Sequence, residues 1–504
     1  MRRFHVDARM TTGNPLRMPK NSHHNRRSFI KTTGKATAAS ALAGVALPHV
    51  HANVDDTVQV ALIGAGGRGT GAAHNALSVS AANGPTKLVA MADVFEDKMK
   101  SSFNSLSKRH GPEKVDVGKV NDKGIPERGY IGFDSYKKAM DHLKPGDVAI
   151  FTTPPGFRWV FFDYAVKRGL NVFMEKPVTA DGFGTKKILE INETAKKKNL
   201  KVGVGLMCRH SRARRQMTDR IADGQLGELL LLRSYRMHGP VASARSLPQK
   251  SVPEYRDLEE IRWQIRRFHS FLWASGGAFN DYYIHTIDEC CWMKGAQLGD
   301  PENNNQDSWP IYAQATGGRH YRGDYVDQNF DTYSVEYTFS DGTKLWHNGR
   351  TINGCHNEFA SYAHGTKGMG IFSINGHWPA DTQMFTGQTP NPANLTWRFN
   401  KRVNGKLIKE TNPYQDEWDD LLDAIRNDKP FNEADRGARA SQICNMGRMA
   451  AHTGQRITWE QSLNAPAFSP NLDKASLDGP APVTADKDGK YPVPMPGIVK
   501  DREY

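Results

Sequence analysis

The stretch from Val60 to Gly69 strongly constrains the fold, because an apolar run in it breaks directly into three spaced glycines. It reads Val-Ala-Leu-Ile-Gly-Ala-Gly-Gly-Arg-Gly, which is typical of a buried strand followed by G-x-G-x-x-G and the start of a helix. In this setting Gly64 permits the tight turn, Gly66 lets the backbone approach a pyrophosphate, and Gly69 lets the helix pack on the strand. The pattern predicts a dinucleotide site at a helix N-terminus, where free N–H groups and the helix dipole favour an anion.

A second strand supports this prediction. Residues 87–92 are apolar after Lys87, and they end in Asp93, 24 residues past Gly69. That spacing is close to the one expected for the acid that binds the ribose hydroxyls of the adenosine. A carboxylate there repels the 2′-phosphate of NADP, so we expect NAD rather than NADP as the cofactor. Arg68 is the residue most able to reverse that preference.

Strands and helices keep alternating up to residue 206, and this alternation predicts an α/β Rossmann domain with a doubly wound parallel sheet over residues 53–206. Residues 101–128 are polar and rich in Lys, Gly and Ser, and we expect them to form a surface insertion. The further strands and helices are expected at residues 148–151, 159–168, 171–174, 182–198 and 202–206.

The short motifs of this region all follow predicted strands. Ligands of such sheets bind at the carboxyl ends of the strands, and the glycine loop, Asp93, Thr152-Thr153-Pro154-Pro155 and Glu175-Lys176-Pro177 all fall there. We therefore expect one nucleotide site. Its predicted cofactor-binding residues are Gly64, Gly66, Gly67, Arg68, Gly69, Asp93, Thr153, Pro154, Glu175 and Lys176.

Residues 1–52 are predicted to form an export signal rather than part of the fold. Arg26-Arg27-Ser28-Phe29-Ile30-Lys31 resembles a twin-arginine signal, and it precedes a weakly apolar run (36–47) and the A-x-A-like end Val50-His51-Ala52. The run is too short to cross a bilayer of about 30 Å. We expect export by the twin-arginine route to a periplasmic or extracytoplasmic location.

The charge of the chain belongs largely to that segment. The sequence has 67 Lys and Arg and 54 Asp and Glu, a net charge of +13. Residues 1–52 contribute nine basic residues and one acid, which leaves 58 and 53 in the remainder, a net charge of +5. So small an excess does not indicate nucleic acid as a partner. The five cysteines are odd in number and include no C-x-x-C, so we expect no disulfide framework, and Cys290 and Cys291 should fill a core.

Together these motifs carry a resemblance to a known family. The order G-x-G-x-x-G, Asp, T-P, E-K-P is similar to that of the glucose–fructose oxidoreductase and inositol dehydrogenase family of nicotinamide-dependent enzymes. The similarity runs from about residue 57 to 455 and includes three later segments. These are residues 221–229 (Ile-Ala-Asp-Gly-Gln-Leu-Gly-Glu-Leu), the signature from Gly276-Gly277 to Asp288, and His364-Gly365-Thr366-Lys367-Gly368.

The resemblance implies a second, α+β domain with an open, mainly antiparallel sheet over residues 207–467, including C-terminal helices. It also implies a homodimer or homotetramer, because the open sheet commonly makes the oligomer contacts. Residues 468–504 are rich in Pro, Asp and Lys, and this composition predicts an extended tail. The chain departs from the family at Arg158, where a His is common, and at Tyr283, where a Gly is common. These differences affect the details of the cofactor and substrate pockets.

The signature itself predicts the catalytic residues. If residues 278–293 are helical, Asp281, His285 and Asp288 share one face. A carboxylate beside an imidazole raises the pKa of that imidazole and readies it for proton transfer. By resemblance, His285 takes the hydroxyl proton, Asp281 binds neighbouring hydroxyls or assists His285, and Lys176 polarises the reacting oxygen. Asp288, at i+7 from Asp281, is left out of the predicted catalytic set. Arg209, after the last strand of the first domain, is the further predicted substrate contact.

Three functions remain open from the sequence. The first is an oxidoreductase that moves hydride from a hydroxyl-bearing carbon of a sugar, polyol or related carbohydrate. The second is an NAD-dependent glycosidase that oxidises its sugar transiently, eliminates the glycosidic bond and returns the hydride. The third is a sugar sensor without catalysis, against which Lys176, Asp281 and His285 argue. Hydride transfer needs no metal, and four candidate ligands lack a compact spacing, so we expect none. They are His347, Cys355, His356 and His364.

Overall fold

The computed structural model describes residues 56–504, apart from 321, 375, 400, 401, 404, 405 and 408. The predicted export signal therefore lies outside the described residues. Within them, no helix combines the length and the apolar character that crossing a membrane requires.

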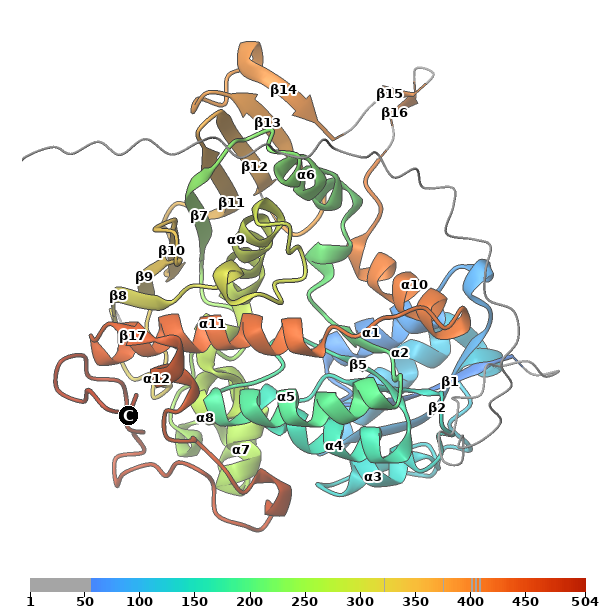
Figure 1. The fold of residues 1–504 in the computed structure, drawn as a ribbon. Coiled ribbons are helices and arrows are strands. Elements are labelled where there is room, and N and C mark those ends of the chain that lie inside the picture. Colours follow the sequence, from blue (N-terminus) through green and yellow to red (C-terminus); the bar gives the residue numbers. More distant parts are fainter. Residues whose placement is uncertain (1–55, 321, 375, 400–401, 404–405, 408) are drawn as a thin grey trace, which may run out of the picture. The chain divides into compact units, whose positions relative to one another are not determined.

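Six parallel strands form the first sheet of the described chain, in the order β3-β2-β1-β4-β5-β6 (Figure 1). This is the order of a Rossmann fold, and the chain reverses direction across the sheet between β1 and β4, where such folds bind ligands. The predicted doubly wound sheet is confirmed. The strands are β1 (Val58–Ile63), β2 (Thr86–Asp93), β3 (Gly129–Ile131), β4 (Val148–Phe151), β5 (Asn171–Met174) and β6 (Val202–Val204).

Helices cover both faces of this sheet. Ala72, Met99 and Trp418 belong to one core, and the Trp418 ring packs 4.5 Å from that of Phe173. The helices on this face are α1 (Gly67–Leu77), α2 (Glu96–Lys114) and α10 (Pro413–Arg426). The helices on the other face are α3 (Ser135–Met140), α4 (Arg158–Arg168) and α5 (Gly182–Lys197).

Two features of the first domain differ from the expectations. Residues 101–110 continue α2 instead of belonging to a surface insertion, and the helix is interrupted at Gly111, whose φ is 70°. Its Met99 and Leu106 are buried at helical spacing despite the many polar neighbours. The polar loop is limited to residues 115–128, between α2 and β3. In addition, α10 was expected in the second domain, yet its apolar side completes the core of the first. A contact between segments so far apart in the chain leaves no local signal.

Nine strands of the described chain form the second sheet, in the order β14-β13-β12-β11-β7-β10-β9-β8-β17. Every neighbouring pair is antiparallel except β7 and β10, which run parallel. The predicted open, mainly antiparallel sheet is thus confirmed. The strands are β7 (Leu229–His238), β8 (Tyr312–Gly318), β9 (Thr332–Thr338), β10 (Lys344–Thr351), β11 (Glu358–Gly365), β12 (Gly368–Ile374), β13 (Gln383–Thr386), β14 (Leu395–Arg398) and β17 (Ile457–Thr458).

A buried helix connects this sheet to the first domain. The predicted helix over 278–293 forms as a π-helical turn (Phe279–Tyr283) that continues into α9 (Ile284–Gln297), and Cys290 and Cys291 lie buried in it as free thiols. Figure 1 shows α11 (Ala434–Thr453) running from the second sheet to α5, which it contacts. The other helices are α6 (Arg212–Ala222), α7 (Glu260–Arg266), α8 (Leu272–Ser275) and α12 (Trp459–Leu463).

The C-terminal segment packs against the fold although it is extended, as expected. Apart from a 3-10 turn at Leu472–Lys474, residues 468–504 contain neither helix nor strand. Tyr491 stacks on Trp263 with ring centroids 5.7 Å apart. The Glu503 carboxylate accepts hydrogen bonds from Arg448 at 2.9 Å and lies 2.6 Å from Nδ1 of His452. This buried cluster attaches the segment to α11.

Replacing Glu503 by Gln should destabilise the protein. Burial opposes the charge of Glu503, but Arg448 and His452 outweigh it and lower the pKa of Glu503 to about 2. Its contribution is therefore complete above the ordinary carboxyl pKa of 4.5 and is lost as the pH falls toward 2. Removing one partner of a buried ion pair costs about 3–5 kcal/mol. Denaturant unfolding at pH 7 should show that loss.

Asp501→Asn is the matched control, because the Asp501 side chain is 79% exposed. It should change the free energy of unfolding by less than about 0.5 kcal/mol. Equal stability of wild type and Glu503→Gln at pH 7 would show that the cluster does not attach the tail.

Candidate active site

A cavity of about 660 Å³ lies at the carboxyl ends of β1, β2, β4 and β5. All ten residues predicted to bind the cofactor line it, and so do the predicted catalytic residues Lys176, Asp281 and His285. The second domain supplies the opposite wall. The residues of that wall that bear on the chemistry are Arg236, His269, Asp281, Tyr282, His285 and His377.

The glycine loop has the geometry of a cradle. Gly64 has a positive φ of 98°, which side chains rarely adopt, and a Cβ on Gly69 would lie 2.0 Å from the Gly64 carbonyl oxygen. A Cβ on Gly66 or Gly67 would meet nothing within 4 Å, although both line the cavity. Gly64 and Gly69 are thus needed for the turn and its packing, whereas Gly66 and Gly67 leave room beside the backbone for a ligand.

Asp93 and Arg68 are each held by protein groups. The Asp93 carboxylate accepts hydrogen bonds from the backbone N–H of Ala65 at 2.6 Å and of Phe95 at 2.9 Å, while burial raises its pKa. Arg68 donates to Glu175 at 2.5 Å and to Glu417 at 3.2 Å. Because two carboxylates already hold the Arg68 guanidinium, it is poorly placed to bind a further phosphate.

Arg158, one of the two departures from the family pattern, joins two of the strand ends. Its buried guanidinium donates to the Thr153 carbonyl at 2.6 and 3.1 Å and to the carbonyls of Glu175 and Pro177. Burial lowers the pKa of Arg158 to about 10. The loops after β4 and β5 are therefore fixed relative to each other by a cation beneath the cavity.

Lys176 and Asp281 form an ion pair across the two domains. Nζ of Lys176 lies 3.3 Å from Oδ1 of Asp281 and also donates to the Asp281 carbonyl, although the residues are 105 positions apart. Nε2 of His269 lies 3.2 Å from the other carboxylate oxygen. Burial opposes the charge of Asp281, but Lys176 and His269 outweigh it and lower its pKa. Asp281 therefore stays ionised.

The expected support of His285 by Asp281 is not found, because the Asp281 carboxylate is taken by Lys176 and His269. His285 packs against His377 instead, with ring centroids 4.3 Å apart. Burial, and then His377, Lys176 and Arg236, lower the pKa of His285 well below its ordinary value, whereas we expected a raised pKa. Its imidazole is thus uncharged at neutral pH.

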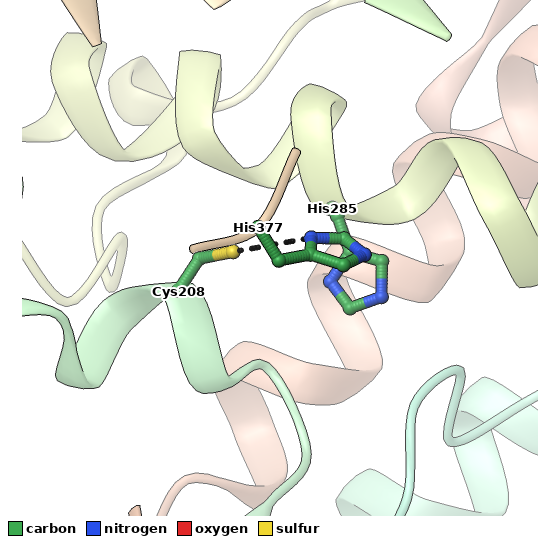
Figure 2. Close-up of side chains that lie close together, drawn as sticks. All are labelled: Cys208, His285 and His377. Atoms are coloured by element: carbon green, nitrogen blue, oxygen red, sulfur yellow. Dashed lines mark hydrogen bonds between the residues drawn. The ribbon is translucent and has the colours of Figure 1, made fainter. Parts of the chain in front are cut away.

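His285 belongs to a compact group with Cys208 and His377 (Figure 2). Nδ1 of His377 lies 3.8 Å from the Cys208 thiol. His285 is 5% exposed, and its Nδ1 has no hydrogen-bond partner among the described residues. Burial raises the pKa of Cys208 well above its ordinary value.

Arg209, the further predicted substrate contact, does not line the cavity. Its guanidinium donates to Asp288 at 2.7 and 2.8 Å and to Asn303 at 2.8 Å. Arg209 is 3% exposed, so its positive charge is paired inside the protein and does not face a substrate. Asp288, which was left out of the predicted catalytic set, binds the Arg209 guanidinium.

Three residues of the cavity wall that bear on the chemistry were not predicted from the sequence: Arg236, Tyr282 and His377. His269 belongs to the aromatic and basic run 263–273, whose composition and position before the double glycine indicate the mouth of a substrate pocket, and it lines the cavity. Tyr282 is next to Asp281 in the signature. Arg236 and His377 carry no local signal, because they reach the cavity only through the pairing of β7 and the course of the chain after β12.

Several solved structures share this architecture. An aldose-aldose oxidoreductase from Caulobacter crescentus complexed with glycerol aligns with a TM-score of 0.55 and 15% identity, covering 80% of this chain and 99% of that one. A myo-inositol 2-dehydrogenase from Lactobacillus plantarum aligns with a TM-score of 0.52 and 19% identity, covering 80% and 99%. A scyllo-inositol dehydrogenase from Lactobacillus casei aligns at 0.51 and 18%, covering 80% and 98%. The chain shares its two-domain fold with these oxidoreductases. No protein-family model and no curated protein matches the sequence.

The two kinds of glycine in the cradle should respond differently to a methyl group. Gly66→Ala has room in the free protein, so its melting temperature should stay near that of wild type, while its nucleotide affinity should fall about tenfold, or ~1.4 kcal/mol. Gly69→Ala forces a clash with the Gly64 carbonyl and should lower the free energy of unfolding by about 1–3 kcal/mol. Calorimetric titration with NAD and thermal unfolding measure the two effects. Unchanged nucleotide affinity in Gly66→Ala would contradict the cradle.

Proposed function

We propose that the protein is a nicotinamide-dependent oxidoreductase that oxidises a hydroxyl group of a sugar, polyol or related carbohydrate. One observation carries this proposal: the glycine cradle and the group Lys176, Asp281 and His285 face the same cavity from two domains. A fold shared with carbohydrate oxidoreductases is consistent with it.

The residues divide the chemistry between them. Lys176 presents its ammonium to the reacting oxygen and stabilises the negative charge that develops there. Asp281 orients Lys176 and His269 and accepts hydrogen bonds from neighbouring hydroxyls. His285, uncharged and buried, accepts the hydroxyl proton. A bound nicotinamide supplies the hydride acceptor. His269 and Tyr282 stack with centroids 5.5 Å apart and present an aromatic surface to a sugar ring.

We infer NAD rather than NADP as the cofactor. Asp93 places a carboxylate at the end of β2, where it repels a 2′-phosphate. Arg68, the cation that could have offset this repulsion, is held by Glu175 and Glu417.

Variants of the three catalytic residues should lose activity and keep the nucleotide, because none of them belongs to the glycine cradle. His285→Ala should lower the rate by about 10²–10⁴, the usual loss of a proton-transfer group. Lys176→Ala should lower both turnover and substrate affinity, and Asp281→Asn should act in the same direction. The assay follows NADH absorbance and released products over a panel of sugars, polyols and glycosides. Product release without net NADH would indicate the glycosidase alternative.

His356→Ala is the control, since His356 is exposed and outside the cavity. It should retain the wild-type rate within about twofold, well below the general-base loss. If wild type turns over a substrate and all three site variants match it, the active site is wrongly placed.

We further propose export by the twin-arginine route and a homo-oligomer built on the open sheet. The route carries folded proteins, so it suits an enzyme that loads its nucleotide before export. The second sheet presents Trp346 (50% exposed) and Leu230 (56% exposed) on β10 and β7, and such apolar side chains favour a contact between copies. No nucleic acid or membrane partner is proposed.

Arg26→Lys combined with Arg27→Lys should leave the protein folded, nucleotide-loaded and in the cytoplasm. Fractionation of expressing cells measures this, with Lys20→Arg, which keeps the charge and the arginine pair, as the control. Normal export of the double variant would rule out the twin-arginine route.

A further inference from the structure

We propose that Cys208, His285 and His377 form a binding site for a divalent transition metal such as Zn²⁺. Each side chain offers one ligand atom, and these atoms all lie within 4.8 Å of one another. They come from three separate parts of the chain: the 3-10 turn Met207–His210, α9, and the segment between β12 and β13 (Figure 2). This site differs from the expectation of no metal, which rested on candidate ligands close together in the sequence and not on residues that the fold brings together.

The polar atoms of this group are available to a ligand. Nδ1 of His285 is buried without a hydrogen-bond partner in the described chain, which is a costly state for an imidazole nitrogen. The contact between Cys208 and His377, at 3.8 Å, is the weak hydrogen bond of a thiol. A metal would satisfy all three groups at once.

The spacing of the ligand atoms suits a small tetrahedral ion. Zinc bonds of about 2.3 Å to sulfur and about 2.0 Å to nitrogen hold the ligand atoms roughly 3.5 Å apart. Closing the group from its present spacing takes side-chain movements of about 1 Å on that geometry. Sulfur with two imidazoles is a donor set that favours zinc over magnesium or calcium.

Two of the three cations around the group are paired with carboxylates. Arg214 is paired with Glu289 at 2.8 Å and Lys176 with Asp281, whereas Arg236 has no carboxylate partner among the described residues. Glu289 also faces the thiol. A bound Cys208 thiolate would neutralise one of the two positive charges of the metal ion. The site therefore keeps a net positive charge, which favours an oxygen anion as the next ligand.

Three protein ligands leave one coordination position open, as in catalytic rather than structural zinc sites. His285 and His377 line the cavity whereas Cys208 lies behind them, so the open position faces the cavity. Arg236, which also lines it, has no carboxylate partner among the described residues and packs over Phe359 at 3.7 Å. A substrate oxygen would thus meet the metal, Lys176 and Arg236 together.

The role of this metal rests on the proposed function. A hydroxide on the metal would take the proton of the substrate hydroxyl and leave as water, and the resulting alkoxide would bind the metal. The C–H bond would then break, with its electron pair going as hydride to the nicotinamide. After the carbonyl product leaves, a new water on the metal would lose a proton to solvent and restore the hydroxide. His285 is a ligand in this metal-loaded form, and the hydroxide does the proton transfer that His285 performs in the metal-free form.

Cobalt titration of the full-length protein tests the site without activity. After chelator treatment, one equivalent of Co²⁺ should give the intense visible bands of a four-coordinate ion and a thiolate-to-cobalt charge-transfer band, both removed by Zn²⁺. Cys208→Ser should lose the charge-transfer band. His377→Ala should weaken binding by more than the roughly 10–100-fold cost of an outer-sphere change. Cys355→Ser, at an exposed thiol, should match wild type.

The metal site is overturned if cobalt does not bind stoichiometrically, or if the charge-transfer band survives in Cys208→Ser. Should Cys208→Ser fail to fold, the thermal shift of wild type with Zn²⁺ and its loss in His377→Ala replace that comparison; no shift in wild type overturns the site. NADH formation is measured separately. Hydride transfer without metal binding contradicts only the metal site, whereas metal binding without hydride transfer contradicts only the proposed function.

Discussion

The ion pair between Lys176 and Asp281 is the contact on which the cavity depends. Lys176 follows β5 of the first sheet, and Asp281 lies in the π-helical turn before α9 of the second domain. Their 3.3 Å contact brings the end of the first sheet to the buried helix that carries His285. Arg158 fixes the loops beneath Lys176, and His269 fixes Asp281 from the other side. Positioning of the reacting groups thus follows from paired charges rather than from loop shape.

This arrangement distributes charge in a useful way. Asp281 remains ionised and holds Lys176, so the ammonium is kept at the cavity wall. His285 remains uncharged because cations surround it and burial excludes water. A cation and an uncharged imidazole thus line one cavity.

The sequence predicted the parts of the structure that are encoded locally. The glycine loop, Asp93 and Lys176 stand at or just after the carboxyl ends of regular parallel strands, so their common location could be deduced. The signature from Gly276 to Asp288 similarly predicted a helix with Asp281 and His285. The features that could not be deduced depend on contacts between distant segments. Examples are the packing of α10 on the first sheet and the approach of His377 to His285.

The errors have the same origin. Arg209 was predicted to meet the substrate because it follows β6, but the partner that removes it from the cavity, Asp288, is 79 positions away. For Asp281 the resemblance implied either contact with neighbouring hydroxyls or support of His285, and helical spacing does not reveal that Lys176 and His269 contact its carboxylate.

Deuterium transfer tests directly whether this cavity moves hydride from a carbohydrate carbon to a nicotinamide. The nucleotide-loaded protein is incubated in single turnover with sugars, polyols and glycosides that carry deuterium on the hydroxyl-bearing carbons, and the released nucleotide is analysed by mass. If hydride is transferred in this cavity, deuterium from at least one compound appears at the nicotinamide, and His285→Ala greatly slows its appearance. A preparation that binds the nucleotide and turns over a carbohydrate, yet never labels the nicotinamide, would contradict hydride transfer in this cavity.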